Sequence, residues 1–139
     1  MTTPEVLHTA VLVRLRAVPN LTAYDGVVPT TPPADASGRT YPYVVVWPSA
    51  GYRPNEIADD LAGTPDETLE WPVQVTVAGG DPTWVLQAAT RARRALAGVF
   101  LTPQTGRLRE EPGAPPISVD PDVKPARFFL PLLFRTQGA

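Results

Sequence analysis

Residues 69–78 constrain the fold more than any other part of the chain, because large apolar side chains alternate there with smaller or polar ones. A period of two residues places all the large apolar side chains on one face of a β-strand. Those side chains belong to Leu69, Trp71, Val73, Val75 and Val77. One face of this strand is therefore predicted to be core, and further elements must cover it.

Two segments have the start signals and the spacing of amphipathic α-helices. Residues 4–17 follow Thr3, a favourable N-cap residue, and residues 82–97 follow Asp81, another one. In both segments a proline occupies the first helical position, where its missing N–H costs nothing. Apolar residues then recur at roughly helical spacing. The sequence therefore predicts one helix before the alternating strand and one helix after it.

Further strands are predicted where β-branched and aromatic residues gather between turn signals. The strongest is 41–47, and 21–28 predicts a short strand pair or a bulged strand around Asp25-Gly26. The remaining strands are predicted at 107–111, 117–120 and 126–136. Within the last of them, Pro131 requires a bulge or an edge position, because proline cannot donate to the ladder.

The order of these elements predicts an α+β fold with one mostly antiparallel β-sheet and two α-helices packed on one face. With 139 residues the chain fits one domain, 1–139, with long loops at 29–40 and 49–68. Residues 43–47 and 128–134 are apolar on both faces of their strands, although two helices cover only one face. The second face is covered either by loops or by a neighbouring subunit.

Composition excludes several classes of site. The chain has no cysteine, so it has no thiol nucleophile, no disulfide and no thiolate metal site. Its single histidine, His8, is expected to be structural, and we expect no catalytic residue, no metal and no cofactor. A net charge of −2 predicts no specific nucleic-acid binding, and no apolar run approaches the ~18 residues of a membrane span. Neither a signal peptide nor a membrane partner is expected.

The long loop at 49–68 is acidic. Its carboxylates are Glu56, Asp59, Asp60, Asp66 and Glu67. Their spacing lacks the alternating oxygen ligands of an EF-hand loop, which favours a solvated or partner-facing loop over a Ca²⁺ or Mg²⁺ site.

Arginines concentrate on the second predicted helix. Arg91, Arg93 and Arg94 form a basic cluster there, and Arg14 and Arg16 lie on the first helix. No series of aromatic residues is interleaved with them, so the pattern favours a solvated helix face or a salt-bridged subunit contact over phosphate binding.

The chain as a whole, from residue 5 to residue 136, resembles the tail terminator proteins of long, non-contractile-tailed phages, especially those of actinobacterial hosts. The segments that carry the resemblance are the amphipathic opening helix, AYDGVVP at 23–29, YPYVVVWP at 41–48, WPVQVTVAGGD at 71–81, RARRALAG at 91–98, TGR at 105–107 and the closing FFLPLLFRT. No single one of these motifs is diagnostic, because such families share a layout more than invariant residues.

The resemblance implies a non-enzymatic virion protein, assembled in the host cytoplasm and located at the head-proximal end of the tail. It would form a homo-hexameric ring on the finished tail tube, end tube polymerisation and offer a surface for head attachment. Its partners would be further copies of itself, the major tail tube protein and a head–tail connector or stopper protein. Under this interpretation the acidic loop would contact the tube or the next subunit, and Arg91 and Arg94 would lie on the complementary side.

Two alternatives stay open. Within virion assembly, the chain could be a head–tail connector or a tail-tube subunit, since these share parts of the layout. In another class, it could be a small α+β metal- or ligand-binding domain that uses the acidic loop as its site.

Overall fold

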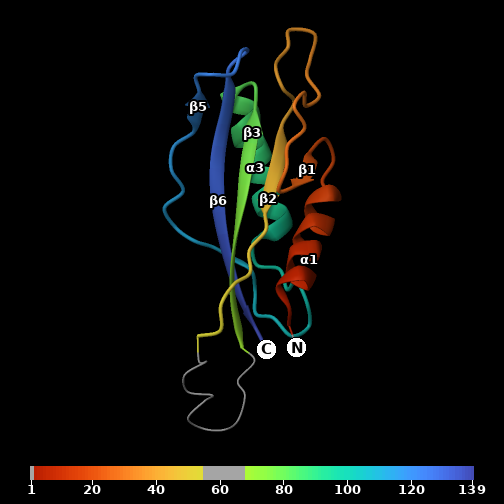
Figure 1. The fold of residues 1–139 in the computed structure, drawn as a ribbon, viewed down its shortest axis with the longest axis vertical. Helices are drawn as coiled ribbons and strands as arrows, with labels where there is room; N and C mark the ends of the chain where they lie inside the picture. The colour runs from red at the N-terminus through yellow and green to blue at the C-terminus, as the bar shows by residue number, and fades with distance from the viewer. Residues whose placement is uncertain (1, 55–67) are drawn as a thin grey trace.

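The computed structural model describes residues 2–54 and 68–139, and this part of the chain contains two helices and six strands (Figure 1). The elements are α1 (Pro4–Arg16), β1 (Thr22–Asp25), β2 (Tyr43–Trp47), β3 (Leu69–Gly79), α3 (Pro82–Leu96), β4 (Arg109–Glu110), β5 (Ser118–Asp120) and β6 (Arg127–Gly138). No helix in the described ranges is long and apolar enough to cross a membrane.

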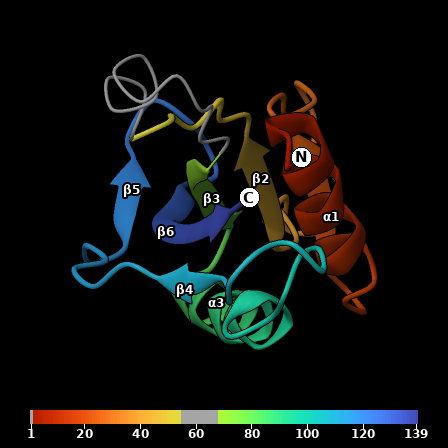
Figure 2. The ribbon, with the colours of Figure 1, turned by 90° about the horizontal axis from the view of Figure 1, so that it is seen from below.

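All six strands belong to one sheet with the order β1-β2-β3-β6-β4, and β5 pairs with β6 beside β4. Every pairing is antiparallel except that of β1 with β2. Helix α1 packs against β1 and β2, and α3 packs against β3 and β6, so both helices lie on the same side of the sheet (Figure 2). The predicted α+β fold, a mostly antiparallel sheet with two helices on one face, is confirmed.

The alternation of residues 69–78 defines the core as predicted. The five large apolar side chains of β3 are all buried, and they join the buried faces of α1, α3, β2 and β6 in one cluster. Trp71 is the largest fully buried side chain, and its indole N–H donates to the carbonyl of Ser49 over 2.8 Å. A buried indole N–H needs such a partner, so Trp71 also fixes the chain just after β2.

Residues 21–28 form neither the strand pair nor the bulged strand that the sequence predicts. They contain one strand, β1, which ends at Asp25 and pairs in parallel with β2. Gly26 then has a φ of +69°, and its N–H donates to the carbonyl of Val46. The Asp-Gly signal therefore marks the end of a strand, and the partner strand comes from farther along the chain.

Pro131 lies in β6, an interior strand next to β3, which at first sight conflicts with the predicted edge position. β5 pairs with residues 127–129 of β6 and β4 with residues 134–135, so the stretch around Pro131 has a strand partner on one side only. The carbonyl of Leu133 accepts from Glu111 on the β4 side, and backbone groups two residues apart point to the same side. The nitrogen of Pro131 thus faces the local gap, where no N–H is needed.

The face of the sheet opposite the helices is only partly covered. Tyr43, Val45 and Ala78 are buried there in a second, smaller cluster, packed against Tyr24, Val28 and Phe129. Farther along the same strands, Trp47 and Leu133 are each 41% exposed. Local packing therefore covers one end of this face and leaves the other end open.

Candidate functional site

The less covered end of the sheet presents a surface with exposed apolar side chains, which we call the open face. The strand register places Trp47 of β2, Gln74 of β3 and Leu133 of β6 in one row across three adjacent strands. The next row contributes Thr76 and Pro131, and Thr76 accepts a 2.9 Å hydrogen bond from the Trp47 indole. The open face thus consists of Trp47, Gln74, Thr76, Pro131 and Leu133. Exposed large apolar side chains grouped in this way are typical of a protein–protein contact.

A second feature lies on the helix layer, between the C-terminal ends of α1 and α3. It is a hollow of about 500 Å³, which we call the arginine hollow. Its lining residues are Arg14, Ala17, Val18, Pro19, Arg91, Arg94, Ala95 and Val99. Three arginine side chains and five apolar residues therefore line the hollow.

Two of these arginines are held by reciprocal hydrogen bonds. Arg14 of α1 donates to the carbonyl of Phe100, just after α3, over 3.3 Å. Arg91 of α3 donates to the carbonyl of Pro19, just after α1, over 3.2 Å. Each helix thus contacts the chain that leaves the other helix through one arginine hydrogen bond.

The arginines predicted from the sequence separate into two environments. Arg91 and Arg94 line the hollow, together with Arg14. Arg93, the third member of the predicted cluster, points elsewhere and forms an ion pair with Glu110 of β4. The other predicted contact residues, Glu56, Asp59, Asp60, Asp66 and Glu67, lie outside the described residues.

Arg91 also lines a neighbouring groove of about 710 Å³, which sequence reasoning missed. Tyr41 and Trp84 stand in its wall with their rings stacked at a centroid distance of 6.1 Å. Nothing in the sequence places Tyr41 beside the first turn of α3, because the loop 29–40 brings it there. An aromatic residue at the very start of the predicted strand 41–47 is the only signal that could have pointed to it.

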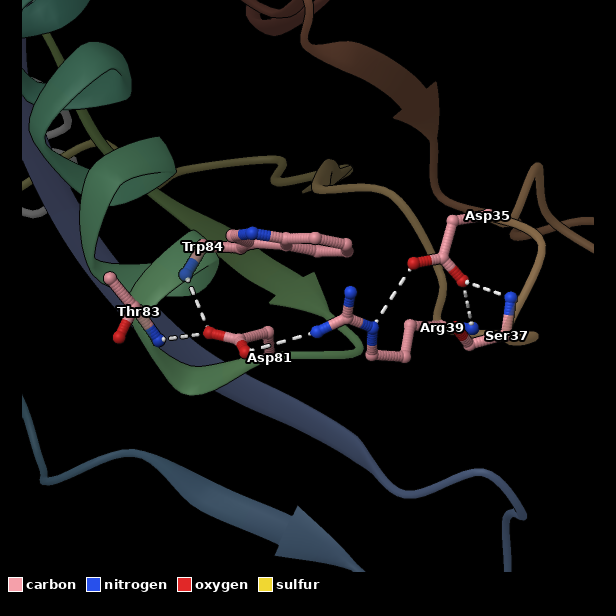
Figure 3. Close-up of polar contacts among 6 residues, drawn as sticks. All are labelled: Asp35, Ser37, Arg39, Asp81, Thr83 and Trp84. Atoms are coloured by element: carbon pink, nitrogen blue, oxygen red, sulfur yellow. Dashed lines mark hydrogen bonds and ion pairs between the residues drawn. The ribbon is translucent and has the colours of Figure 1, made fainter.

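The loop 29–40 is fastened to the start of α3 through Arg39 (Figure 3). The Arg39 side chain forms an ion pair with Asp35 over 3.0 Å and another with Asp81 over 3.6 Å, and it lies over the Trp84 ring. Asp81 in turn caps α3 by accepting from the backbone N–H groups of Thr83 and Trp84. The loop, the cap and the aromatic wall of the groove therefore form one connected set.

The charge on Asp35 follows from the same contacts. Desolvation acts to raise the pKa of Asp35, but hydrogen bonds from the backbone N–H and the guanidinium of Arg39 outweigh it and lower the pKa below its ordinary value. A further hydrogen bond from the N–H of Ser37 acts in the same direction. Asp35 is thus held in the ionised form that Arg39 requires.

His8 is partly buried, with its side chain 15% exposed. Its Nε2 atom lies 2.6 Å from a carboxylate oxygen of Asp25, which β1 brings to α1. Its Nδ1 atom is buried and has no partner among the described residues.

Within residues 2–54 and 68–139, no group of three or more Asp, Glu or His side chains is placed to hold a metal ion. Comparison with known proteins adds no family assignment, since no family model matches the chain and no curated protein is significantly similar to it. The fold and its surfaces define an α+β domain with two distinct candidate contact surfaces, the open face of the sheet and the arginine hollow of the helix layer.

Proposed function

We propose that this protein is a virion assembly protein, a tail terminator that forms a ring on the end of a phage tail tube. The observation that carries the proposal is the open face: Trp47 and Leu133 are both exposed in one row across the sheet, on either side of Gln74, on the surface opposite the helices. A second copy of the chain is the occupant that we infer for it.

A closed ring of identical subunits needs two different surfaces that fit each other, because each contact joins one side of a subunit to another side of the next. This chain has an apolar surface on the sheet side and a hollowed, basic surface on the helix side. That arrangement supports a head-to-tail ring more than a symmetric dimer, in which one surface would meet itself. The ring would be hexameric, and its partners would be the major tail tube protein and the head–tail connector or stopper protein.

The ring is tested by light scattering coupled to size-exclusion chromatography over a wide concentration range, with electron microscopy of any large species. A closed particle of six 15.0 kDa subunits, about 90 kDa, is the expected result. Long tubes would instead identify a tail-tube subunit. If the free protein is monomeric, adding it to growing tail tubes of the same phage must stop their elongation, and continued elongation would contradict the terminator role.

The competing class, a metal-binding domain built on the acidic loop, has a separate test. Adding Ca²⁺ or Mg²⁺ to such a domain would raise its unfolding temperature, and a chelator would reverse the effect. Under the assembly proposal neither treatment changes the unfolding temperature.

A further inference from the structure

We propose that the groove of about 710 Å³ beside Tyr41 and Trp84, the aromatic groove, binds residues 112–116 of a neighbouring copy of the chain. Residues 112–116, which we call the proline loop, connect β4 to β5 and have the sequence PGAPP. This inference rests on the proposed ring and names a contact that would join one subunit to the next.

The proline loop is an exposed, extended segment. All five of its residues are exposed. Each proline fixes its own φ and restricts the residue before it to extended conformations, so Ala114-Pro115-Pro116 favours polyproline II. Among the described residues, no backbone–backbone hydrogen bond involves residues 112–116. The loop therefore presents proline rings and carbonyl groups that can accept hydrogen bonds from a partner.

Both ends of the proline loop are held by β6. Directly before the loop, the N–H of Glu111 donates to the carbonyl of Leu133, and the Glu111 side chain pairs with Arg135 over 2.9 Å. Directly after the loop and Ile117, Ser118 begins β5, which pairs with β6. Fixing the ends of a segment before it binds reduces the entropy that binding costs.

The aromatic groove has the side chains that a polyproline II segment needs. Such segments dock in grooves lined by aromatic residues, and here Tyr41 is 50% exposed and stacks on Trp84. Gln87 and Arg91 follow Trp84 three and seven positions later, so the three side chains lie along one face of α3. The Gln87 amide and the Arg91 guanidinium supply N–H donors for the carbonyl groups that polyproline II leaves unbonded.

Within one subunit the sheet separates the proline loop from the aromatic groove. Residues 112–115 line a small hollow of about 210 Å³ together with Gln74 and Leu133 of the open face. The aromatic groove is lined by α3, which packs on the opposite face of the sheet (Figure 2). The loop of one copy and the groove of another can therefore meet head to tail, as a ring requires.

The position of the proline loop also fits the proposed contact at the open face. Because the loop borders the open face, it would reach the helix layer of the same neighbour that covers that face. The open face and the proline loop would thus form one continuous surface on one side of the subunit, and the aromatic groove would belong to the other side.

Two double variants test the contact from its two sides. P115A/P116A removes two proline rings from the loop, and Y41A/Q87A removes one aromatic ring and one amide from the groove. Both chains should stay folded, because all four residues are exposed. Each variant is expected to lose ring assembly at concentrations where the wild type assembles, with folding checked by thermal denaturation.

Matched controls make the same exchanges at exposed residues elsewhere. P103A/P121A removes two other exposed prolines, and Y52A/Q104A removes a tyrosine that is also 50% exposed together with an exposed glutamine. Both controls should assemble like the wild type. Loss of assembly in the controls to the same extent as in the test variants would contradict the inference.

The outcomes separate the inference from the proposed function. Ring assembly of P115A/P116A or of Y41A/Q87A at the wild-type concentration would overturn the inference and leave the proposed ring intact. A wild-type chain that neither forms rings nor stops tube growth would count against the proposed function itself.

A peptide of residues 110–118 tests the groove without any need for a ring. Fluorescence anisotropy is expected to show binding of this peptide to P115A/P116A, whose own loop cannot compete. Binding should be weaker by about tenfold or more to the chain with all four substitutions, and a peptide with alanine at positions 115 and 116 should lose a similar factor. Absence of binding to P115A/P116A, equal binding by the two chains, or equal binding of the two peptides would contradict the inference.

Discussion

The guanidinium of Arg39 lies over the indole ring of Trp84, with its Cζ atom 4.6 Å from the ring centroid. The same side chain pairs with Asp35 in its own loop and with Asp81 at the start of α3 (Figure 3). One arginine thus connects the loop 29–40 to the first turn of the helix that carries Arg91 and Arg94. The position of the loop beside the aromatic groove depends on this connection.

Replacing Arg39 should loosen the loop. Because the Arg39 side chain is 43% exposed, its ion pairs contribute little, and the stacking on Trp84 adds about 0.5–1 kcal/mol. We expect R39A to lower the free energy of unfolding by about 1 kcal/mol and R39K to recover only part of it. Urea denaturation followed by tryptophan fluorescence measures both, with R109A as the control for loss of an exposed arginine.

The two helix starts should respond differently to loss of the N-cap side chain. Asp81 accepts from two backbone N–H groups of α3, whereas Thr3 makes no such bond to α1. D81A should therefore cost about 1 kcal/mol of unfolding free energy, and D81N, which can still accept, should cost less. T3A should change stability by less than about 0.5 kcal/mol, and a loss for T3A as large as for D81A would contradict this account.

Gly80 should not tolerate a side chain. A Cβ atom at this position would lie 2.6 Å from the backbone nitrogen of Thr40 and 2.9 Å from the Cα of Arg39. Because backbone atoms cannot swing aside, G80A should destabilise the fold by about 1–3 kcal/mol and displace the loop. At Gly106 the nearest atom to such a Cβ is 3.8 Å away, so G106A is the matched control and should be close to neutral in thermal denaturation.

Stability should fall at high pH because of Tyr43. Burial raises the pKa of this phenol above the ordinary value of 10.0, although Arg127 acts in the opposite direction. Below pH 10 the phenol is neutral in both the folded and the unfolded state. Its burial then contributes in full to the free energy of unfolding. As the pH rises from about 10 through the folded-state pKa, the unfolded chain ionises first and unfolding becomes easier.

Y43F should therefore lose part of this decline as the pH rises above about 10. Urea denaturation at a series of pH values measures it, and Y52F is the control for removing one phenol. An identical pH dependence in Y43F and the wild type would show that the decline has another origin.

The open face should matter for assembly and not for folding. Leu133 is 41% exposed on the sheet, and Leu86 is 56% exposed on the helix layer, so neither side chain is needed in the core. We expect L133R to keep the wild-type unfolding temperature and to lose ring assembly or tube capping. L86R adds the same charge on the helix layer and should assemble normally. If L133R also assembles, the open face is not part of the ring contact.

Much of the fold was predictable because its signals are local. The cap and proline before α3 and the alternation in β3 are satisfied by residues close in sequence, and both elements have their predicted extents within a residue or two. The prediction of a strand pair around Asp25 was wrong because it also relied on a local signal. A turn signal reports the local backbone, and the partner of β1 is set by burial of Ala23 and Tyr24 beside β2, about 20 residues later.

The candidate site was predictable only in its residue types. The sequence by itself determined the two amphipathic helices, the apolar strands, the surplus of apolar sheet surface and the presence of basic residues on the second helix. Only the tertiary structure decided that Arg93 pairs with Glu110 while Arg91 and Arg94 join Arg14 around a hollow. The side chains of one helix point in different directions every few residues, and what each one meets depends on how the helix is rotated against the sheet, a property of the whole core and not of any segment.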